Sequence, residues 1–382
     1  MSQRPDEASP GRSPHGGSSE PEAALPASRS SAALRRAVLV MVALVLLLAA
    51  SCVFRLFVGE PSLESGYWLS WPDGSIWAAV VRMYTGDLVV HSPITVMDLR
   101  VFRLVAAVLV GASLAGSGVS LQALLRNPLA EPFILGLSTG AVLGVVVQLL
   151  VAHVTTAPMG PLHIGALVGA AGAMAIVFAA ARRHRVIDPL GLLLVGVVVS
   201  TINGALITVL AYLAPLSLRD QAFRWGLGFI NEGVGPVGMI SVTVVAVVGL
   251  VVLVVVGRAM DVSTFSDAEA KSMGLPLERM RLTLFLAASG LAAGAVVLAG
   301  PIAFVGLICP HVVRLMLGPG HRGLVVGAAL VGAMLILWAD MASILLDVWN
   351  DRGRMPIGIF TALLGGPVFL WMLRPYLGRG LT

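Results

Sequence analysis

Charged residues are scarce in this sequence of 382 residues. Asp, Glu, Lys and Arg make up 12% of the chain and hydrophobic residues 57%, whereas an ordinary soluble domain has about 25% charged residues. There is too little polar surface to cover a water-soluble globule of this length, so the apolar residues must face lipid. The composition excludes a soluble enzyme, a nucleic-acid-binding protein and a disordered scaffold, and it indicates a membrane protein.

Cysteine and lysine are also nearly absent. Cys52 and Cys309 are the only cysteines and lie far apart, which excludes a disulfide framework and a cysteine metal site. The single lysine, Lys271, follows Ala270, so the sequence lacks the Gly-Lys-Ser/Thr ending of a phosphate-binding loop. It also lacks a zinc-type His/Glu cluster and a serine-nucleophile elbow. We therefore expect no catalytic residue, no metal and no cofactor, and we expect a separate subunit to hydrolyse any ATP that drives transport.

Long apolar runs dominate what is present. A membrane-spanning helix needs about 20 mostly apolar residues, and backbone groups in the hydrocarbon core must bond within the segment. Small residues are dense from Gly111 to Gly118 and from Gly165 to Gly172, which lets helices approach closely. The sequence predicts an all-α polytopic membrane protein with about ten transmembrane helices. The predicted spans are residues 37–58, 102–125, 133–153, 163–181, 191–213, 237–257, 281–299, 302–317, 323–346 and 357–373.

The N-terminal segment differs from the rest. Residues 1–34 are rich in Pro, Ser, Gly, Ala and Glu and cannot bury enough apolar surface to offset their chain entropy. We predict a disordered cytoplasmic tail over 1–34 and a membrane domain over 35–378. Most positive charge then falls in inner connections, such as 182–185 and 258–281, as the positive-inside rule requires. We predict a multi-pass protein of the bacterial plasma membrane with both termini in the cytoplasm.

Several arginines oppose this bias because they lie on the predicted outer side. A cationic outer rim would steer and dock an acidic partner. Pairing with nearby aspartates explains the same residues equally well, and the spacing does not decide between these readings. The arginines are Arg100, Arg103, Arg219, Arg224, Arg352 and Arg354, and the candidate partners within the chain are Asp98, Asp220, Asp347 and Asp351.

A proline-bracketed turn follows the second predicted span. Residues 127–136 read Asn-Pro-Leu-Ala-Glu-Pro-Phe-Ile-Leu-Gly. Pro128 and Pro132 interrupt helix geometry and leave backbone groups free, which is tolerated where protein or a water-filled cavity meets them. From the residues alone, this turn is either a gate at the inner mouth of a pathway or an ordinary hairpin between two spans.

Together with Gly111, Gly118 and Gln122, this run closely resembles the FecCD family of ABC-transporter permeases, which import iron-siderophores, haem and vitamin B12. The resemblance extends from about Arg100 to Pro375. It implies a type II ABC importer permease-like fold, a second permease subunit in a homodimer or paired heterodimer, two cytoplasmic ATP-binding subunits and a periplasmic or lipid-anchored solute-binding protein. Its other blocks are Ala299 to Leu307, Pro310-His311, Arg314, Ala339-Asp340, Pro356 to Ile359 and Gly365 to Phe369.

The resemblance also implies roles for individual residues. Arg100 and Arg103 match arginines that help to dock the binding protein. The cytoplasmic gate would include Asn127, Pro128 and Leu129. The loop 259–280 would contact the ATP-binding subunit, and its sequence alone also indicates a polar helix that ends before Pro276. The coupling residues in that loop would be Asp267, Ala268, Glu269, Lys271 and Gly274.

Two positions depart from the family pattern. Ile344 stands where the family usually has an arginine, four residues after Asp340, and Arg354 stands where it favours glutamate. We hypothesise that Arg352 or Arg354 takes over the missing docking arginine. Asp340 is an intramembrane carboxylate and therefore a functional candidate by default, but we interpret it as a paired packing group.

These observations predict the transmembrane permease subunit of an ATP-driven importer for a ferric siderophore or related iron chelate. The alternative is a cobalamin or haem importer permease. A more remote alternative is an ion-coupled secondary transporter, which would need paired acidic or cation-binding residues at mid-membrane, and Asp340 alone gives it little support. The long outer segment 59–98 is predicted to hold an amphipathic interfacial helix near residues 76–85.

Overall fold

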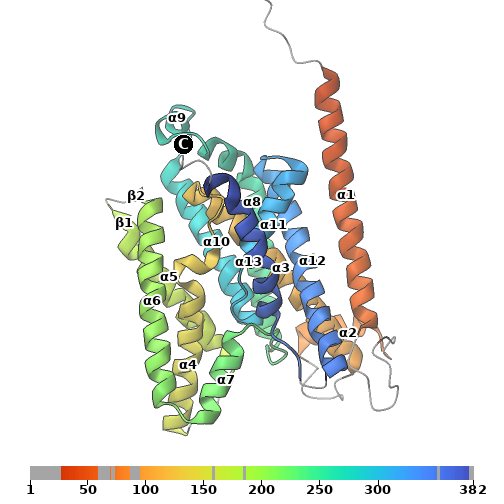
Figure 1. The fold of residues 1–382 in the computed structure, drawn as a ribbon, viewed down its shortest axis with the longest axis vertical. Coiled ribbons are helices and arrows are strands. Elements are labelled where there is room, and N and C mark those ends of the chain that lie inside the picture. Colours follow the sequence, from red (N-terminus) through yellow and green to blue (C-terminus); the bar gives the residue numbers. More distant parts are fainter. Residues whose placement is uncertain are drawn as a thin grey trace, which may run out of the picture.

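The computed structural model of the chain describes residues 27–58, 69, 74–86, 95–156, 160–183, 186–350 and 353–377. These residues are almost entirely helical, with one two-stranded hairpin of β1 (Arg182–Arg183) and β2 (Val186–Ile187) (Figure 1). The α-helices are α1 (Ala27–Phe57), α2 (Ile76–Thr85), α3 (Val96–Leu125), α4 (Leu137–Thr155), α5 (Leu162–Ala181), α6 (Pro189–Leu213), α7 (Leu216–Gly226), α8 (Pro236–Ser263), α9 (Asp267–Ser272), α10 (Leu277–Ala299), α11 (Val305–Leu317), α12 (His321–Asn350) and α13 (Ile357–Leu377). A 3-10 turn, η1 (Pro132–Leu135), precedes α4.

Each of the ten predicted spans matches one apolar helix, although the spans 37–58, 133–153 and 302–317 extend past the ends of theirs by one to four residues. In the described residues, eight helices are long and apolar enough to cross a membrane, and Val305–Leu317 and Ile357–Met372 are shorter apolar helices. The all-α polytopic fold is therefore confirmed. Helix α11 begins three residues later than predicted because Gly300 and Phe304 adopt positive φ angles of 65° and 70°, which breaks the helix between α10 and α11.

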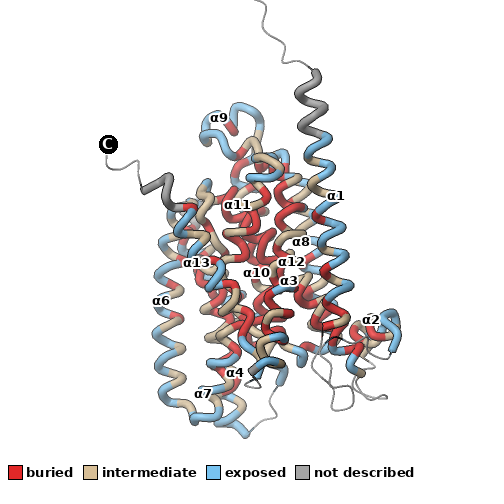
Figure 2. Tube along the Cα trace, turned by 45° about the vertical axis from the view of Figure 1, so that its right-hand side comes forward, coloured by how far each residue is buried: buried red, intermediate tan, exposed pale blue. Residues whose placement is uncertain are grey.

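Helix α3 occupies the centre of the bundle and packs against α8, α10, α11 and α12. Figure 2 shows the buried residues concentrated along these helices, whereas α1 and α6 are largely exposed. The small residues predicted to allow close packing make the tightest crossings. Gly111 meets the backbone of Gly332 on α12, and Gly118 meets Gly306 on α11, with no room for a Cβ at either crossing.

The short helices mark the two ends of the bundle. Helix α9 lies at one end, hereafter the α9 end, and α2 and α7 lie at the other, hereafter the α2 end (Figure 1). The amphipathic segment predicted near 76–85 is helix α2, whereas α7 was not predicted. Helix α1 begins at Ala27, inside the segment predicted to be a tail. Residues 1–26 lie outside the described residues, so the disorder of the tail and the boundary of the membrane domain stay predictions.

Candidate functional site: two arginine–aspartate networks

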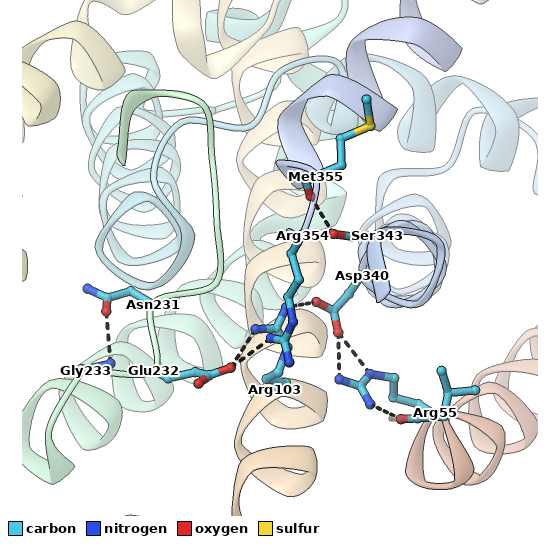
Figure 3. Close-up of polar contacts among 10 residues, drawn as sticks. Arg55, Arg103, Asn231, Glu232, Gly233, Asp340, Ser343, Arg354 and Met355 are labelled. Atoms are coloured by element: carbon cyan, nitrogen blue, oxygen red, sulfur yellow. Dashed lines mark hydrogen bonds and ion pairs between the residues drawn. The ribbon is translucent and has the colours of Figure 1, made fainter. Parts of the chain in front are cut away.

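A network of five charged residues lies near the α2 end and joins five parts of the chain. We call it the Asp340 network; its members are Arg55 (α1), Arg103 (α3), Glu232 (the α7–α8 connection), Asp340 (α12) and Arg354 (the α12–α13 connection) (Figure 3). Charges alternate along it, so each carboxylate lies between two guanidinium groups.

Asp340 is the buried centre of this network and its side chain is 0% exposed. Its Oδ2 accepts from Arg55 Nε at 2.9 Å and also contacts Arg55 Nη2 at 2.9 Å. Its Oδ1 accepts from Arg103 Nη2. Arg55 Nη1 donates to the Val58 carbonyl oxygen at 2.8 Å, which satisfies a further donor of this buried side chain. The interpretation of Asp340 as a paired packing group is consistent with this geometry, since buried charges need such partners.

Arg100 and Arg103 are both buried. Arg100 Nη1 donates to the Leu56 carbonyl oxygen at 2.6 Å and to that of Phe57 at 3.1 Å, so it satisfies acceptors at the end of α1. Arg103 Nη1 contacts Glu232 Oε1 at 2.6 Å. A side chain must be accessible to contact another protein, so this burial does not match the predicted docking role. It matches the alternative of pairing within the chain, but with partners other than the aspartates named from spacing.

Arg354 is the more accessible arginine of the network. Its side chain is 25% exposed, and Nη1 lies 3.2 Å from Glu232 Oε1. Both residues line a cavity of about 600 Å³ at the α2 end, and Arg224 and Asp347 line it too. Arg352, the other arginine proposed to replace the one missing at Ile344, lies outside the described residues.

The predicted gate residues form a tight turn directly after α3. Asn127 Oδ1 accepts from the Leu129 backbone N–H at 2.9 Å, and the Asn127 carbonyl oxygen accepts from Ala130 N at 3.1 Å. Asn127 thus folds the chain back on itself as an Asx turn, a recurrent use of this residue type. Pro128 and Leu129 are partly buried. The turn lies at the end of α3 on the side of α9, as the prediction of a gate there requires.

Glu131 links the same connection to the break between α10 and α11. One carboxylate oxygen accepts from the backbone N–H of Phe304, whose φ of 70° is unusual for a non-glycine residue. Burial raises the pKa of Glu131 to about 7, although the hydrogen bond from Phe304 opposes that shift. The Phe304 ring lies against Gly365 on α13, where a Cβ would collide with it. Glu131 therefore connects the gate turn to α11 and α13.

A second network lies at the α9 end. We call it the Asp267 cluster; its members are Arg126, Asp267 and Arg281. Asp267 Oδ1 lies 2.7 Å from Arg126 Nη2, and Asp267 Oδ2 lies 2.9 Å from Arg281 Nη2. Arg126 Nε also donates to the Ser263 carbonyl oxygen at 2.8 Å. Burial raises the pKa of Asp267, but the hydrogen bond from Arg126 and the two guanidinium charges outweigh it and leave that pKa lowered.

Helix α9 carries the predicted coupling residues. It begins with a capping box in which Ser266 and Glu269 exchange hydrogen bonds, a strong start signal for a short helix. Gly274, with φ of 81°, follows its end. The predicted polar helix before Pro276 is therefore confirmed. Asp267 is partly exposed within the Asp267 cluster, and Ala268, Glu269, Lys271 and Gly274 are exposed.

Sequence reasoning missed Arg55, Glu232 and Glu131 as members of these contacts. Arg55 had a usable signal, because an arginine at the end of one span and an aspartate inside another favour each other as partners. Glu232 had none, since nothing in its neighbourhood indicates a fold back onto Arg103. In the described residues, no group of three or more His, Cys, Asp or Glu side chains is placed to hold a metal ion.

The chain matches the FecCD transport family over residues 47–375, and it belongs to that family. It is 38% identical to the vitamin B12 import system permease protein BtuC of Vibrio parahaemolyticus, over 72% of this chain and 82% of that protein. It is 34% identical to the hemin transport system permease protein HmuU of Yersinia pestis, over 72% of this chain and 82% of that protein.

A solved structure supports the same assignment. The chain resembles an inward-facing structure of a protein assigned to the metal-chelate type of ABC transporter, with a TM-score of 0.70 and 27% identity over 88% of this chain and 99% of that one. The chain is thus the multi-pass permease subunit of an ABC importer in the inner membrane. It is not itself catalytic, and it works with separate ATP-binding subunits and a solute-binding protein.

Proposed function

We propose that this permease carries a bulky metal chelate of the corrinoid or tetrapyrrole kind, with cobalamin as the first candidate. The observation that carries the proposal is the similarity to permeases named for vitamin B12 and hemin. This similarity favours a macrocyclic chelate over the ferric siderophore that the sequence analysis put first. A ferric siderophore stays the alternative, since the family match alone does not separate these ligands.

The α9 end faces the cytoplasm in this proposal. Arg258, Lys271, Arg279 and Arg322 gather near that end, and the positive-inside rule favours arginine and lysine on the cytoplasmic side. Helix α1 begins at the α9 end, and α13 runs toward it (Figure 1). Both termini are then cytoplasmic.

The translocation path lies between two permease subunits, as a homodimer or a paired heterodimer. Helix α3 fills the centre of the bundle, and most of its residues are buried. A chelate the size of cobalamin therefore has to pass beside the bundle rather than through it. The cytoplasmic gate would be formed by Asn127, Pro128 and Leu129.

Helix α9 is the contact for the ATP-binding subunit. Its exposed face offers Ala268, Glu269 and Lys271, and Gly274 follows it. At the opposite end, Arg354 or Arg352 docks the solute-binding protein, whereas Arg103 holds Asp340 and Glu232 and Arg100 holds the end of α1. Arg354 supports this assignment because it is partly exposed and lines the cavity at the α2 end.

Uptake measurements in a strain deleted for this chain test the proposal. Cells that regain the chain, with its ATP-binding subunit and its binding protein, should accumulate labelled cobalamin in preference to ferric siderophore and hemin. A phosphate-loop lysine variant of the ATP-binding subunit is the matched control and should abolish uptake. Preference for the siderophore would overturn the choice of ligand. Uptake that survives the ATPase variant but stops with a protonophore would indicate an ion-coupled transporter instead.

A further inference from the structure

The Glu232–Arg354 side of the Asp340 network is more accessible than the side that contains Asp340. Side-chain exposure is 0% at Asp340, 7% at Arg103, 25% at Arg354 and 35% at Glu232. The pairs at the buried end are costly to break, because each would leave a charge without a partner in an apolar surrounding. The Glu232–Arg354 pair is partly hydrated, and such pairs are held only weakly. It is therefore the pair in this network that can exchange partners.

The backbone around Glu232 holds its carboxylate in place. Asn231 N donates to the Leu298 carbonyl oxygen at 2.8 Å, and Asn231 Oδ1 accepts from Gly233 N at 2.9 Å (Figure 3). The same connection supplies the Gly228 carbonyl oxygen, which accepts from Ile357 N, the first residue of α13, at 2.9 Å. The α7–α8 connection thus contacts the start of α13 through this backbone bond, through Glu232 with Arg354, and through Leu227, whose carbonyl oxygen lies against Gly358.

The cavity beside this pair suits an incoming carboxylate. Among the described residues, its charged lining consists of Arg103, Arg224, Arg354, Glu232 and Asp347, so cations outnumber anions by one within that set. Arg354 contacts Glu232 through Nη1 at 3.2 Å. A planar guanidinium can bind a carboxylate with two parallel hydrogen bonds, so a partner carboxylate that does this would displace Glu232. Glu232 would keep its 2.6 Å contact with Arg103 and would not be left unpaired.

We propose that Glu232 competes with the solute-binding protein for Arg354. The Glu232–Arg354 pair holds the start of α13 against the α7–α8 connection until an acidic side chain of the solute-binding protein takes the place of Glu232. The inference rests on the proposed docking function of Arg354. It adds a consequence for the chain itself, because docking then loosens one of the contacts that hold the start of α13.

Two variants separate competition from a change in overall charge. E232Q and D347N each remove one negative charge from the same cavity, and of these two carboxylates it is Glu232 that pairs with Arg354. The assembled transporter in nanodiscs is tested against the binding protein used in the uptake experiment. E232Q should bind that protein roughly two- to fivefold more tightly, the range that corresponds to a partly exposed ion pair, and D347N should change affinity less. In an R354Q background the effect of E232Q should vanish. Equal effects of E232Q and D347N, or an E232Q effect that survives R354Q, would overturn the proposal.

A second measurement needs no binding protein. Hydrogen exchange of the Ile357 amide in the transporter alone should be faster in E232Q than in the wild type, and unchanged in D347N. If hydrogen exchange of the Ile357 amide is unchanged in E232Q, the Glu232–Arg354 pair does not hold the start of α13, whatever the transported ligand is. If wild-type transporter does not bind the binding protein but the exchange result holds, the docking function fails while the role of the Glu232–Arg354 pair at α13 stands.

Discussion

The two ends of the molecule hold the same set of groups in different surroundings. At the α2 end Asp340 lies between Arg55 and Arg103, and at the α9 end Asp267 lies between Arg126 and Arg281. Asp340 is 0% exposed and Asp267 is 44% exposed. An ion triad costs most to break where water cannot replace the lost partner. Burial therefore makes the Asp340 triad costly to rearrange, whereas the partly exposed Asp267 triad can rearrange at lower cost.

The largest expected difference between the two triads appears when the Asp340 carboxylate is removed. D340A leaves Arg55 and Arg103 without their shared carboxylate inside the bundle, and removal of one partner of a buried pair typically costs about 3–5 kcal/mol. Denaturant or thermal unfolding in detergent should show that loss. D347N, which changes a residue of the α2-end cavity, is the control and should stay within about 0.5 kcal/mol of the wild type. A loss below about 1 kcal/mol in D340A would mean that burial does not make this triad costly to break.

A third carboxylate sharpens the comparison, because Glu131 is buried but accepts from a backbone N–H rather than from arginines. Burial raises its pKa to about 7, above the ordinary glutamate value. A raised acid pKa contributes stability at low pH that is lost as pH rises through the folded-state value. Wild-type stability should therefore fall between about pH 5 and 8, by on the order of 2–3 kcal/mol.

The matched variant for that titration is E131Q, which keeps the acceptor and cannot ionise. Its unfolding free energy should be nearly flat over the same pH range. Parallel curves for wild type and E131Q would show that Glu131 titrates normally, and that burial at this position is not enough to shift a carboxylate.

The smallest expected effect on stability comes from D267N. Surface ion pairs contribute about 0.2–1 kcal/mol, so unfolding should change little. Because Asp267 joins α9 to Arg126 beside the gate turn, we expect D267N to lower the amount of substrate moved per ATP hydrolysed, measured in proteoliposomes with the ATP-binding subunits. D261N, on the same side of the bundle but paired with His321, is the control. Equal coupling in D267N and wild type would limit the Asp267 cluster to a local role.

The pH dependence of the Asp267 cluster has the opposite sign to that of Glu131. The pKa of Asp267 is lowered by its arginine neighbours in spite of partial burial. A depressed acid pKa contributes stability above the unfolded value, about 3.9 for aspartate, and that stability is lost as pH falls through the folded value. The difference in unfolding free energy between wild type and D267N should stay constant from pH 5 to 8 and disappear only below about pH 4.

The secondary structure was predictable to the extent that hydrophobicity controls it. Apolar runs located the ten long or short apolar helices of the described residues, and a polar segment that ends at Gly274 and Pro276 located α9. The start of α11 at Val305 was not predictable, because the left-handed Phe304 before it contacts Glu131 and Gly365, which lie far away in the sequence. Local sequence carries no record of contacts between residues so distant in the chain.

The candidate site was predicted less well than the fold, and for the same reason. The arginines at the start of α3 were singled out from the sequence, but spacing could not show whether they point outward or inward. Arg103 is buried against Asp340 and Glu232, which lie on other elements. The family resemblance drew attention to the turn at Asn127 and to α9, whose proposed roles stay predictions, but it gave no indication of Arg55.

The Arg55–Asp340 pair also constrains how the chain is made. The two residues are 285 positions apart, and ribosomes add about 5–20 residues per second, so roughly 15–60 s separate their synthesis. Throughout that interval the first helix lacks its counter-ion, and an unpaired arginine at the end of a span would be drawn toward the lipid headgroups. The first helix can contact α3 earlier, through Arg100 and the carbonyl oxygens of Leu56 and Phe57, but Arg55 gains its counter-ion only when α12 is inserted.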